Sequence, residues 1–265
     1  MEPSSAPGPQ FPDPSNEADR ALPPGIGFAR GMAVFIAVFT LFFIVQSGVF
    51  VVHVIGSDPD LSALSLREAL SDPGLLSALQ DHQTDGDAIA AASLWSGLAG
   101  FLATLLFVQL WKRDGWKAFL GFRMFRPRAL FIWSGAFAAL VAVIEVLATF
   151  IPSFRSDYMN EVIGSAHSLP MLLFGVGVMP ALFEETLLRG LFLGTMRHIT
   201  DEHISVAVTA GVFTLMHMQY SAAILLLVLP MGVVLGYART RSGSIWVPIV
   251  LHMLNNVLSV VFPNM

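Results

Sequence analysis

Residues 169–196 read LPMLLFGVGVMPALFEETLLRGLFLGTM, an apolar stretch in which the charged residues are Glu184, Glu185 and Arg189. About 20 apolar residues in a helix cross a bilayer core about 30 Å thick, so this stretch is long enough to span a membrane. A charge at the centre of a bilayer costs about 2.5–3.5 kcal/mol, and such residues are functional by default. The stretch therefore predicts a transmembrane helix that carries functional polar residues.

Long apolar stretches recur along the rest of the chain. Of its 265 residues, 55% are hydrophobic and 12% are charged, whereas a soluble domain carries about 25% charged residues. This composition excludes a soluble domain and a disordered chain, and the lack of cysteine excludes a disulfide-rich scaffold. We predict an all-α polytopic membrane helix bundle of about seven transmembrane helices. The other expected spans are Gly31–Ile55, Ala88–Trp111, Ala129–Ile151, two within 204–237, and Ser244–Phe262.

The N-terminal residues differ from the rest in being rich in proline and serine. We predict a disordered cytoplasmic tail for residues 1–27 and a membrane-embedded domain for residues 28–265. Most Lys and Arg residues lie between spans two and three, before span one, after span four or after span six. In a seven-span path all of these positions are on the same side of the membrane. Because basic loops stay in the cytoplasm, we expect a multi-pass inner-membrane protein with a cytoplasmic N-terminus. The net charge of -5 does not favour a nucleic-acid partner.

On this topology the loop at residues 57–87 lies outside the membrane. It is strongly acidic, and its leucines have the spacing of an amphipathic helix. We expect a short helix that lies at the membrane surface.

Three spans carry polar residues that are costly to bury. Glu185 and Arg189 are four residues apart, so they share a helix face and can form an ion pair. Glu184 points about 100° away from Glu185, so its partner must come from another helix. We expect His217 on the fifth span, while His252 and Asn256 share one face of the last span.

The three ionisable groups outside the predicted ion pair lie at similar depth. At about 1.5 Å per residue, Glu184, His217 and His252 are about 18, 20 and 12 Å from the cytoplasmic ends of their spans. Together with an amide they suit attack by water on a peptide bond. A carboxylate and a histidine can hold and deprotonate the water, and a second histidine and an amide can stabilise the oxyanion. The same donors also suit zinc, so the sequence leaves open a metal-bound water.

At these residues the chain resembles the type II CAAX prenyl endopeptidase family, also called CPBP or ABI, whose members are all-helical intramembrane proteases. The family's motifs are Glu-Glu-x-x-x-Arg, Phe-x-x-x-His and His-x-x-x-Asn or Asp. They occur here in the same order, within a motif core of residues 169–258. The matching residues are Glu184, Glu185, Arg189, Phe213, His217, His252 and Asn256.

The resemblance implies a role for each matched residue. Glu184 and His217 would activate the water, and His252 and Asn256 would stabilise the oxyanion. The implied activity is that of an intramembrane endopeptidase, or metalloendopeptidase, that cuts a membrane-associated peptide or protein within the lipid bilayer.

Two implications concern the surroundings of the reacting water. Glu185 and Arg189 would orient the site. If a metal such as zinc is used, its ligands would be Glu184, His217 and His252.

Two other classes of protein remain open from the sequence. A non-catalytic membrane protein, such as a bacteriocin-immunity or scaffold factor, would keep these residues for packing alone. A transporter could use the carboxylates for proton coupling, although the chain shows no internal repeat and no pair of broken helices.

Overall fold

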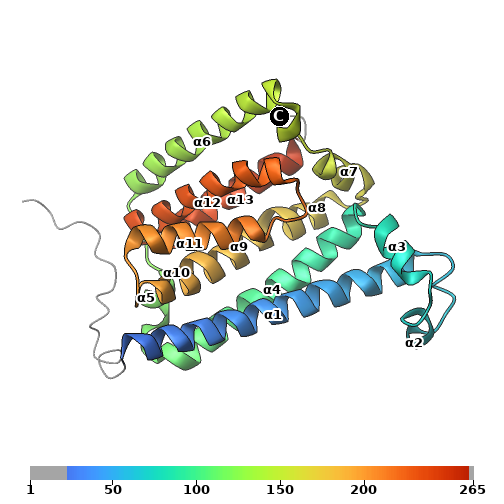
Figure 1. Cartoon of the computed structure of the whole chain (residues 1–265), viewed down its shortest axis with the longest axis horizontal. Helices are drawn as coiled ribbons and strands as arrows, with labels where there is room; N and C mark the ends of the chain where they lie inside the picture. The colour runs from blue at the N-terminus through green and yellow to red at the C-terminus, as the bar shows by residue number, and fades with distance from the viewer. Residues whose placement is uncertain (1–22, 263–265) are drawn as a thin grey trace, which may run out of the picture. The chain divides into compact units, whose positions relative to one another are not determined.

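The computed structural model describes residues 23–262, and the chain is 81% helical, with no strand in that range. Figure 1 shows the helices in chain order. The predicted all-α membrane helix bundle is confirmed. Most of the predicted tail, residues 1–22, lies outside the described residues, so the division between tail and membrane domain stays a prediction.

Each predicted span corresponds to a helical segment of the structure. Five segments are long and apolar enough to cross a membrane: α1 (Pro24–Ser57), α4 (Gly86–Lys112) with its extension to Leu120, α6 (Pro127–Phe150), the composite helix Leu169–Met196, and α12 (Ala222–Ser242). The other two, α11 (Glu202–Leu215) and α13 (Trp246–Val261), have 14 and 16 residues. At about 1.5 Å per residue they are about 21 and 24 Å long, which is less than the thickness of the bilayer core.

The composite helix Leu169–Met196 changes its winding along its length. It consists of α8 (Leu169–Leu172), η3 (Leu173–Val178), α9 (Met179–Glu184), η4 (Glu185–Phe192) and α10 (Leu193–Met196). Both η3 and η4 are π-helical, with hydrogen bonds that span five residues instead of four. π-Helical turns are rare and are frequent at functional sites, and here they flank α9.

The chain divides into two compact units. Among the described residues, unit 1 contains residues 23–35, 104–154 and 185–251, and unit 2 contains residues 36–103, 155–184 and 252–262. In unit 1, α11 and α12 lie side by side, α12 contacts α6, and η4 contacts α5 (Trp116–Leu120), α11 and α12. A short helix η1 (Arg113–Gly115) precedes α5, and η2 (Pro152–Phe154) follows α6.

Glycines let the helices of unit 1 approach one another closely. A Cβ atom on Gly232 of α12 would lie 3.0 Å from the Phe213 ring and 3.2 Å from the Ala210 backbone of α11. Such close packing fixes the spacing of the two helices, because little room remains for a larger residue.

Unit 2 is held together at one end by a network of hydrogen bonds. It includes the helix α7 (Tyr158–Ser165). Ser165 Oγ accepts from the backbone N–H of Gly86 at 2.9 Å and donates to the carbonyl of Thr84 at 2.8 Å. Nδ1 of His167 lies 2.7 Å from Oδ2 of Asp87, at the start of α4. These bonds fix the loop that leads into the composite helix.

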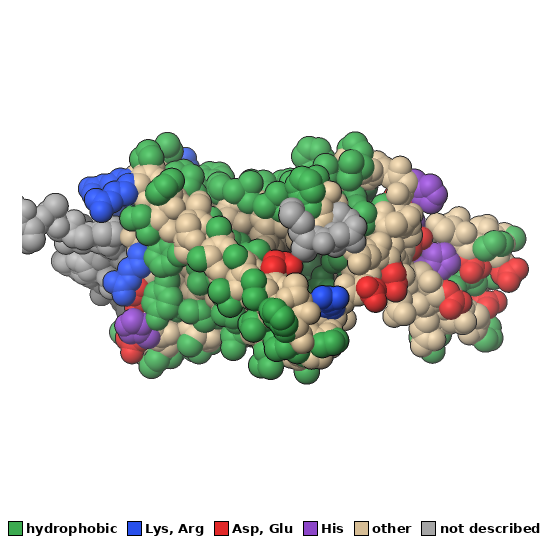
Figure 2. All heavy atoms as spheres, turned by 90° about the horizontal axis from the view of Figure 1, so that it is seen from above, with side chains coloured by type: hydrophobic (Ala, Val, Ile, Leu, Met, Phe, Trp, Pro, Cys, Tyr) green, Lys and Arg blue, Asp and Glu red, His purple; other side chains and the backbone are tan. Residues whose placement is uncertain are grey.

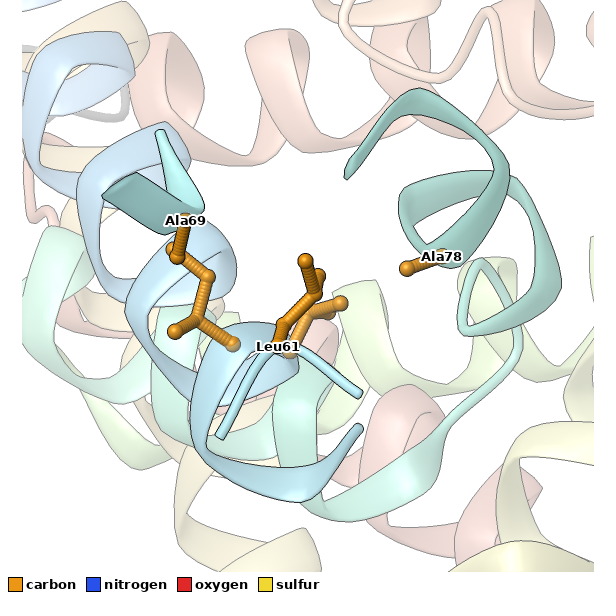
Figure 3. Packing of buried hydrophobic residues seen from close by; sticks show 5 residues of the cluster. Leu61, Ala69 and Ala78 are labelled. Carbon is orange, nitrogen blue, oxygen red and sulfur yellow. The ribbon is translucent and has the colours of Figure 1, made fainter. Parts of the chain in front are cut away.

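The predicted surface helix is instead a small folded cap of unit 2. It contains two short helices, α2 (Leu66–Ala69) and α3 (Leu75–Asp81), and it packs on the end of α1. The side chains of Leu61, Ala69 and Ala78 point into its core together with Val54 (Figure 3). Acidic side chains gather at the surface formed by α2 and α3 (Figure 2). Leucines of the acidic loop, such as Leu75 and Leu79, therefore pack against the core of this cap.

Candidate active site

The paired carboxylates lie where the composite helix changes its winding. Glu184 is the last residue of α9 and belongs to unit 2, whereas Glu185 is the first residue of η4 and belongs to unit 1. Glu184 is half-buried. Its Oε2 atom is shielded from solvent and has no hydrogen-bond partner among residues 23–262. A buried carboxylate oxygen of this kind is costly unless water or a substrate binds it.

Glu185 and Arg189 form the ion pair that their spacing predicts. Arg189 Nη1 donates to Glu185 Oε1 at 3.1 Å, and neither side chain is exposed to solvent. Arg189 Nη2 donates to the carbonyl oxygen of Gly232 at 3.0 Å. The guanidinium also lies 4.4 Å from the centre of the Phe213 ring, within the range of a cation–π interaction. Arg189 thus joins η4 to both α11 and α12.

His217 follows α11 and lies in the turn beyond its last residue, Leu215, and not within the fifth span as expected. Its Nδ1 atom lies 2.8 Å from the backbone carbonyl oxygen of Phe213. Because a carbonyl oxygen can only accept, Nδ1 carries the proton, and the lone pair of the neutral ring is on Nε2. That tautomer leaves Nε2 able to accept a proton or to bind a metal.

Phe213, four positions before the histidine, contacts both His217 and Arg189. Its carbonyl orients His217, and its ring centre lies 4.7 Å from the imidazole of His217. The same ring also contacts the guanidinium of Arg189, which connects the turn that carries His217 to the buried ion pair. The spacing of the motif predicted His217 as a candidate but did not reveal the dual role of Phe213.

His252 and Asn256 lie four residues apart on α13, in the part of the helix that belongs to unit 2. His252 is buried, with 4% of its surface exposed. Asn256 is half-buried, and its Nδ2 atom donates to the backbone carbonyl of Val176 in η3 at 3.4 Å. The residue that receives this bond carries no polar side chain, so no side-chain motif pointed to it.

The predicted site residues fall into two groups according to their unit. Unit 1 brings Glu185, Arg189 and His217 together through contacts with Phe213, and Glu184, His252 and Asn256 belong to unit 2. The catalytic roles of these residues stay predictions.

Zinc would require a set of suitably placed donors. Within residues 23–262 no three His, Asp or Glu side chains are grouped as a set of metal ligands. The predicted set Glu184, His217 and His252 draws its members from both units, and its use as a set of metal ligands stays a prediction.

The spanning helices define a multi-pass membrane protein, with the candidate residues in its C-terminal half. Residues 166–258 of that half match the family model described as Type II CAAX prenyl endopeptidase Rce1-like. The matched segment contains all three motifs, so the resemblance to this family is confirmed there.

Two curated relatives extend the comparison. The chain is 23% identical over 186 residues to the "Putative membrane peptidase YdiL" of Bacillus subtilis, which covers 67% of this chain and 75% of the relative. It is 27% identical over 134 residues to an "Uncharacterized 24.3 kDa protein" of Escherichia coli. This alignment covers 48% of this chain and 61% of the relative. No solved structure matches the chain. The family model and the first relative support a membrane protease at the level of the family.

Proposed function

We propose that this protein is an intramembrane endopeptidase that hydrolyses peptide bonds of membrane-associated proteins or peptides. The observation that carries the proposal is the Oε2 atom of Glu184, which is shielded from solvent inside the family-matched segment and lacks a hydrogen-bond partner among the described residues. A base that must hold a reacting water needs an oxygen that is not already occupied by other hydrogen-bond donors.

The proposed reaction begins with a water molecule held by Glu184 and by Nε2 of His217. As the water oxygen attacks the carbonyl carbon, its proton passes to the Glu184 carboxylate. His252 and the Asn256 amide donate hydrogen bonds to the oxyanion that forms. When the C–N bond breaks, Glu184 returns the proton to the leaving amine, which leaves one new carboxylate and one new amine.

The ion pair between Glu185 and Arg189 supports the part of the proposed site that lies in unit 1. It ties η4 to α11 and α12, and Phe213 links it to His217. We propose that the pair orients the turn that carries His217. We further propose that the protein lies in a cell inner membrane with its N-terminus in the cytoplasm, and that cleavage occurs in the cytoplasmic half of the bilayer.

Hydrolysis in reconstituted proteoliposomes tests the proposed function directly. We expect the wild-type protein to cut at least one of a panel of membrane-anchored peptide reporters in water enriched in oxygen-18. Mass spectrometry should find one heavy oxygen in the new C-terminal carboxylate, because that oxygen comes from the attacking water. A chelator separates the two ways of activating the water: an unchanged rate supports a water held by Glu184 and His217 alone, and a loss restored by added zinc supports a metal-bound water. If no reporter is cut while the protein retains its biological activity after Glu184→Gln, the non-catalytic alternative replaces this proposal.

Adjacent amides on α13 provide a matched pair of variants for the oxyanion. Asn256→Ala should lower kcat about 10²–10³-fold, because a lost oxyanion donor costs about that much. Asn255→Ala, at the neighbouring half-buried position, should leave kcat within about twofold. Equal losses in the two variants would show that Asn256 acts only in packing.

A further inference from the structure

The hydrogen bond between Asn256 and the carbonyl of Val176 raises the question of why that carbonyl can accept from a side chain. Val176 lies near the end of the π-helical segment η3, and the four-residue spacing that α9 resumes would assign its carbonyl the N–H four residues later as donor. The residue four positions after Val176 is Pro180, which has no N–H. The proline therefore removes the ordinary helical donor for this carbonyl.

The π-helical winding of η3 is consistent with this effect of Pro180. Just before the proline the hydrogen bonds of the helix still span five residues, because the N–H of Met179 donates to the carbonyl of Phe174. Where the pattern returns from five-residue to four-residue spacing, the helix leaves a carbonyl without its usual partner. A side-chain donor from a neighbouring helix can then take that place.

A glycine brings α13 close enough to supply the donor. A Cβ atom on Gly177 would lie 3.0 Å from Cγ2 and 3.7 Å from Cα of Val257, the residue that follows Asn256. The absence of a side chain at Gly177 thus allows the close approach of η3 and α13. Even with this approach the bond from Asn256 to Val176 measures 3.4 Å, so a small further separation would break it.

We propose that Pro180 and Gly177 are positioning residues, which make the Val176 carbonyl available and close enough to orient the Asn256 amide for oxyanion binding. This inference rests on the proposed function. One N–H of the amide is held by Val176, which fixes the direction of the second N–H. The second N–H is the donor that would bind the substrate oxyanion.

Pro180→Ala tests the role of the proline. The alanine restores a backbone N–H that competes with Asn256 for the Val176 carbonyl. We expect kcat to fall about 10-fold with KM within twofold, because misplaced catalytic groups lose rate steeply with distance. The thermal midpoint should not fall, because alanine favours a helix interior more than proline does. Pro230→Ala in α12 is the matched control and should leave kcat unchanged.

Gly177→Ala tests the role of the close approach. The added methyl group forces Val257 to move by a few tenths of an ångström, and we again expect a loss in kcat of about 10-fold with KM unchanged. Val257→Ala removes the methyl group that the new Cβ would meet, so the double variant should recover most of the lost kcat. Gly48→Ala controls for glycine replacement in a helix, because a Cβ there meets nothing within 4 Å.

A double-mutant cycle in proteoliposomes shows whether both residues act through Asn256. In an Asn256→Ala background neither Pro180→Ala nor Gly177→Ala should lower kcat further, whereas independent effects would multiply. Normal kcat in both single variants, additive losses in the cycle, or failure of Val257→Ala to rescue would each overturn the proposal. If the wild-type protein cuts no reporter, the proposed function fails first and this inference falls with it.

Discussion

Arg189→Met is expected to destabilise the protein by about 3–5 kcal/mol, because it leaves the Glu185 carboxylate buried without its cationic partner. Both side chains are fully buried, so solvent cannot compensate the charge that remains. The variant also loses the bond to the Gly232 carbonyl and the contact with the Phe213 ring. Unfolding in detergent micelles, followed by circular dichroism against temperature and denaturant, measures the change.

The fork of the guanidinium makes this site specific for arginine. Nη1 and Nη2 of Arg189 donate in two directions, to Glu185 and to Gly232, which the single ammonium of a lysine cannot reproduce with the same geometry. Arg189→Lys should therefore recover only part of the lost stability. The double variant Glu185→Leu and Arg189→Leu should be much more stable than Arg189→Met, because no uncompensated charge remains.

A second ion pair of unit 1 provides the control for the Arg189 variants. Arg241 Nε lies 3.0 Å from Glu202 Oε1, but the Arg241 side chain is 55% exposed. Exposed pairs contribute about 0–1 kcal/mol, so Arg241→Met should have little effect. Similar losses for Arg189→Met and Arg241→Met would contradict the view that the Glu185–Arg189 pair holds η4 against α11 and α12.

The sequence predicted the helical class and the positions of the apolar helices, because bilayer thickness ties hydropathy directly to helix length. It also predicted the pairing of Glu185 with Arg189, since residues four apart on a helix are neighbours. These successes depend on short-range geometry that one helix determines alone.

Features that depend on contacts between helices were not predicted. The bond to the carbonyl of Val176 in η3 comes from Asn256 of α13, which lies 80 residues later in the chain. The imidazole of His217 is oriented by the backbone carbonyl of Phe213, which no side-chain pattern records. The glycines and proline of the GVGVMP run at residues 175–180 were the available signal, and they indicate a helix whose hydrogen bonds are interrupted.

Glu184→Gln should abolish cleavage, with kcat lowered about 10²–10⁴-fold, because the amide cannot take a proton from the attacking water. Glutamine has the same shape as glutamate, and Glu184 Oε2 makes no hydrogen bond to the described residues that the change could break. The thermal midpoint should therefore stay the same or rise, since the variant removes a partly buried charge. Proteoliposome kinetics and detergent unfolding measure the two quantities on one preparation.

Glu145→Gln is the matched control, because it makes the same chemical change within a spanning helix. Glu145 lies on α6 and is exposed at the surface of unit 1, where we assign it no part in the reaction. Loss of activity in Glu184→Gln alone, without loss of stability, requires that the carboxylate acts on the substrate or its water. Equal activity in the two variants would instead make Glu184 a packing residue, since a group needed only for structure tolerates an isosteric amide.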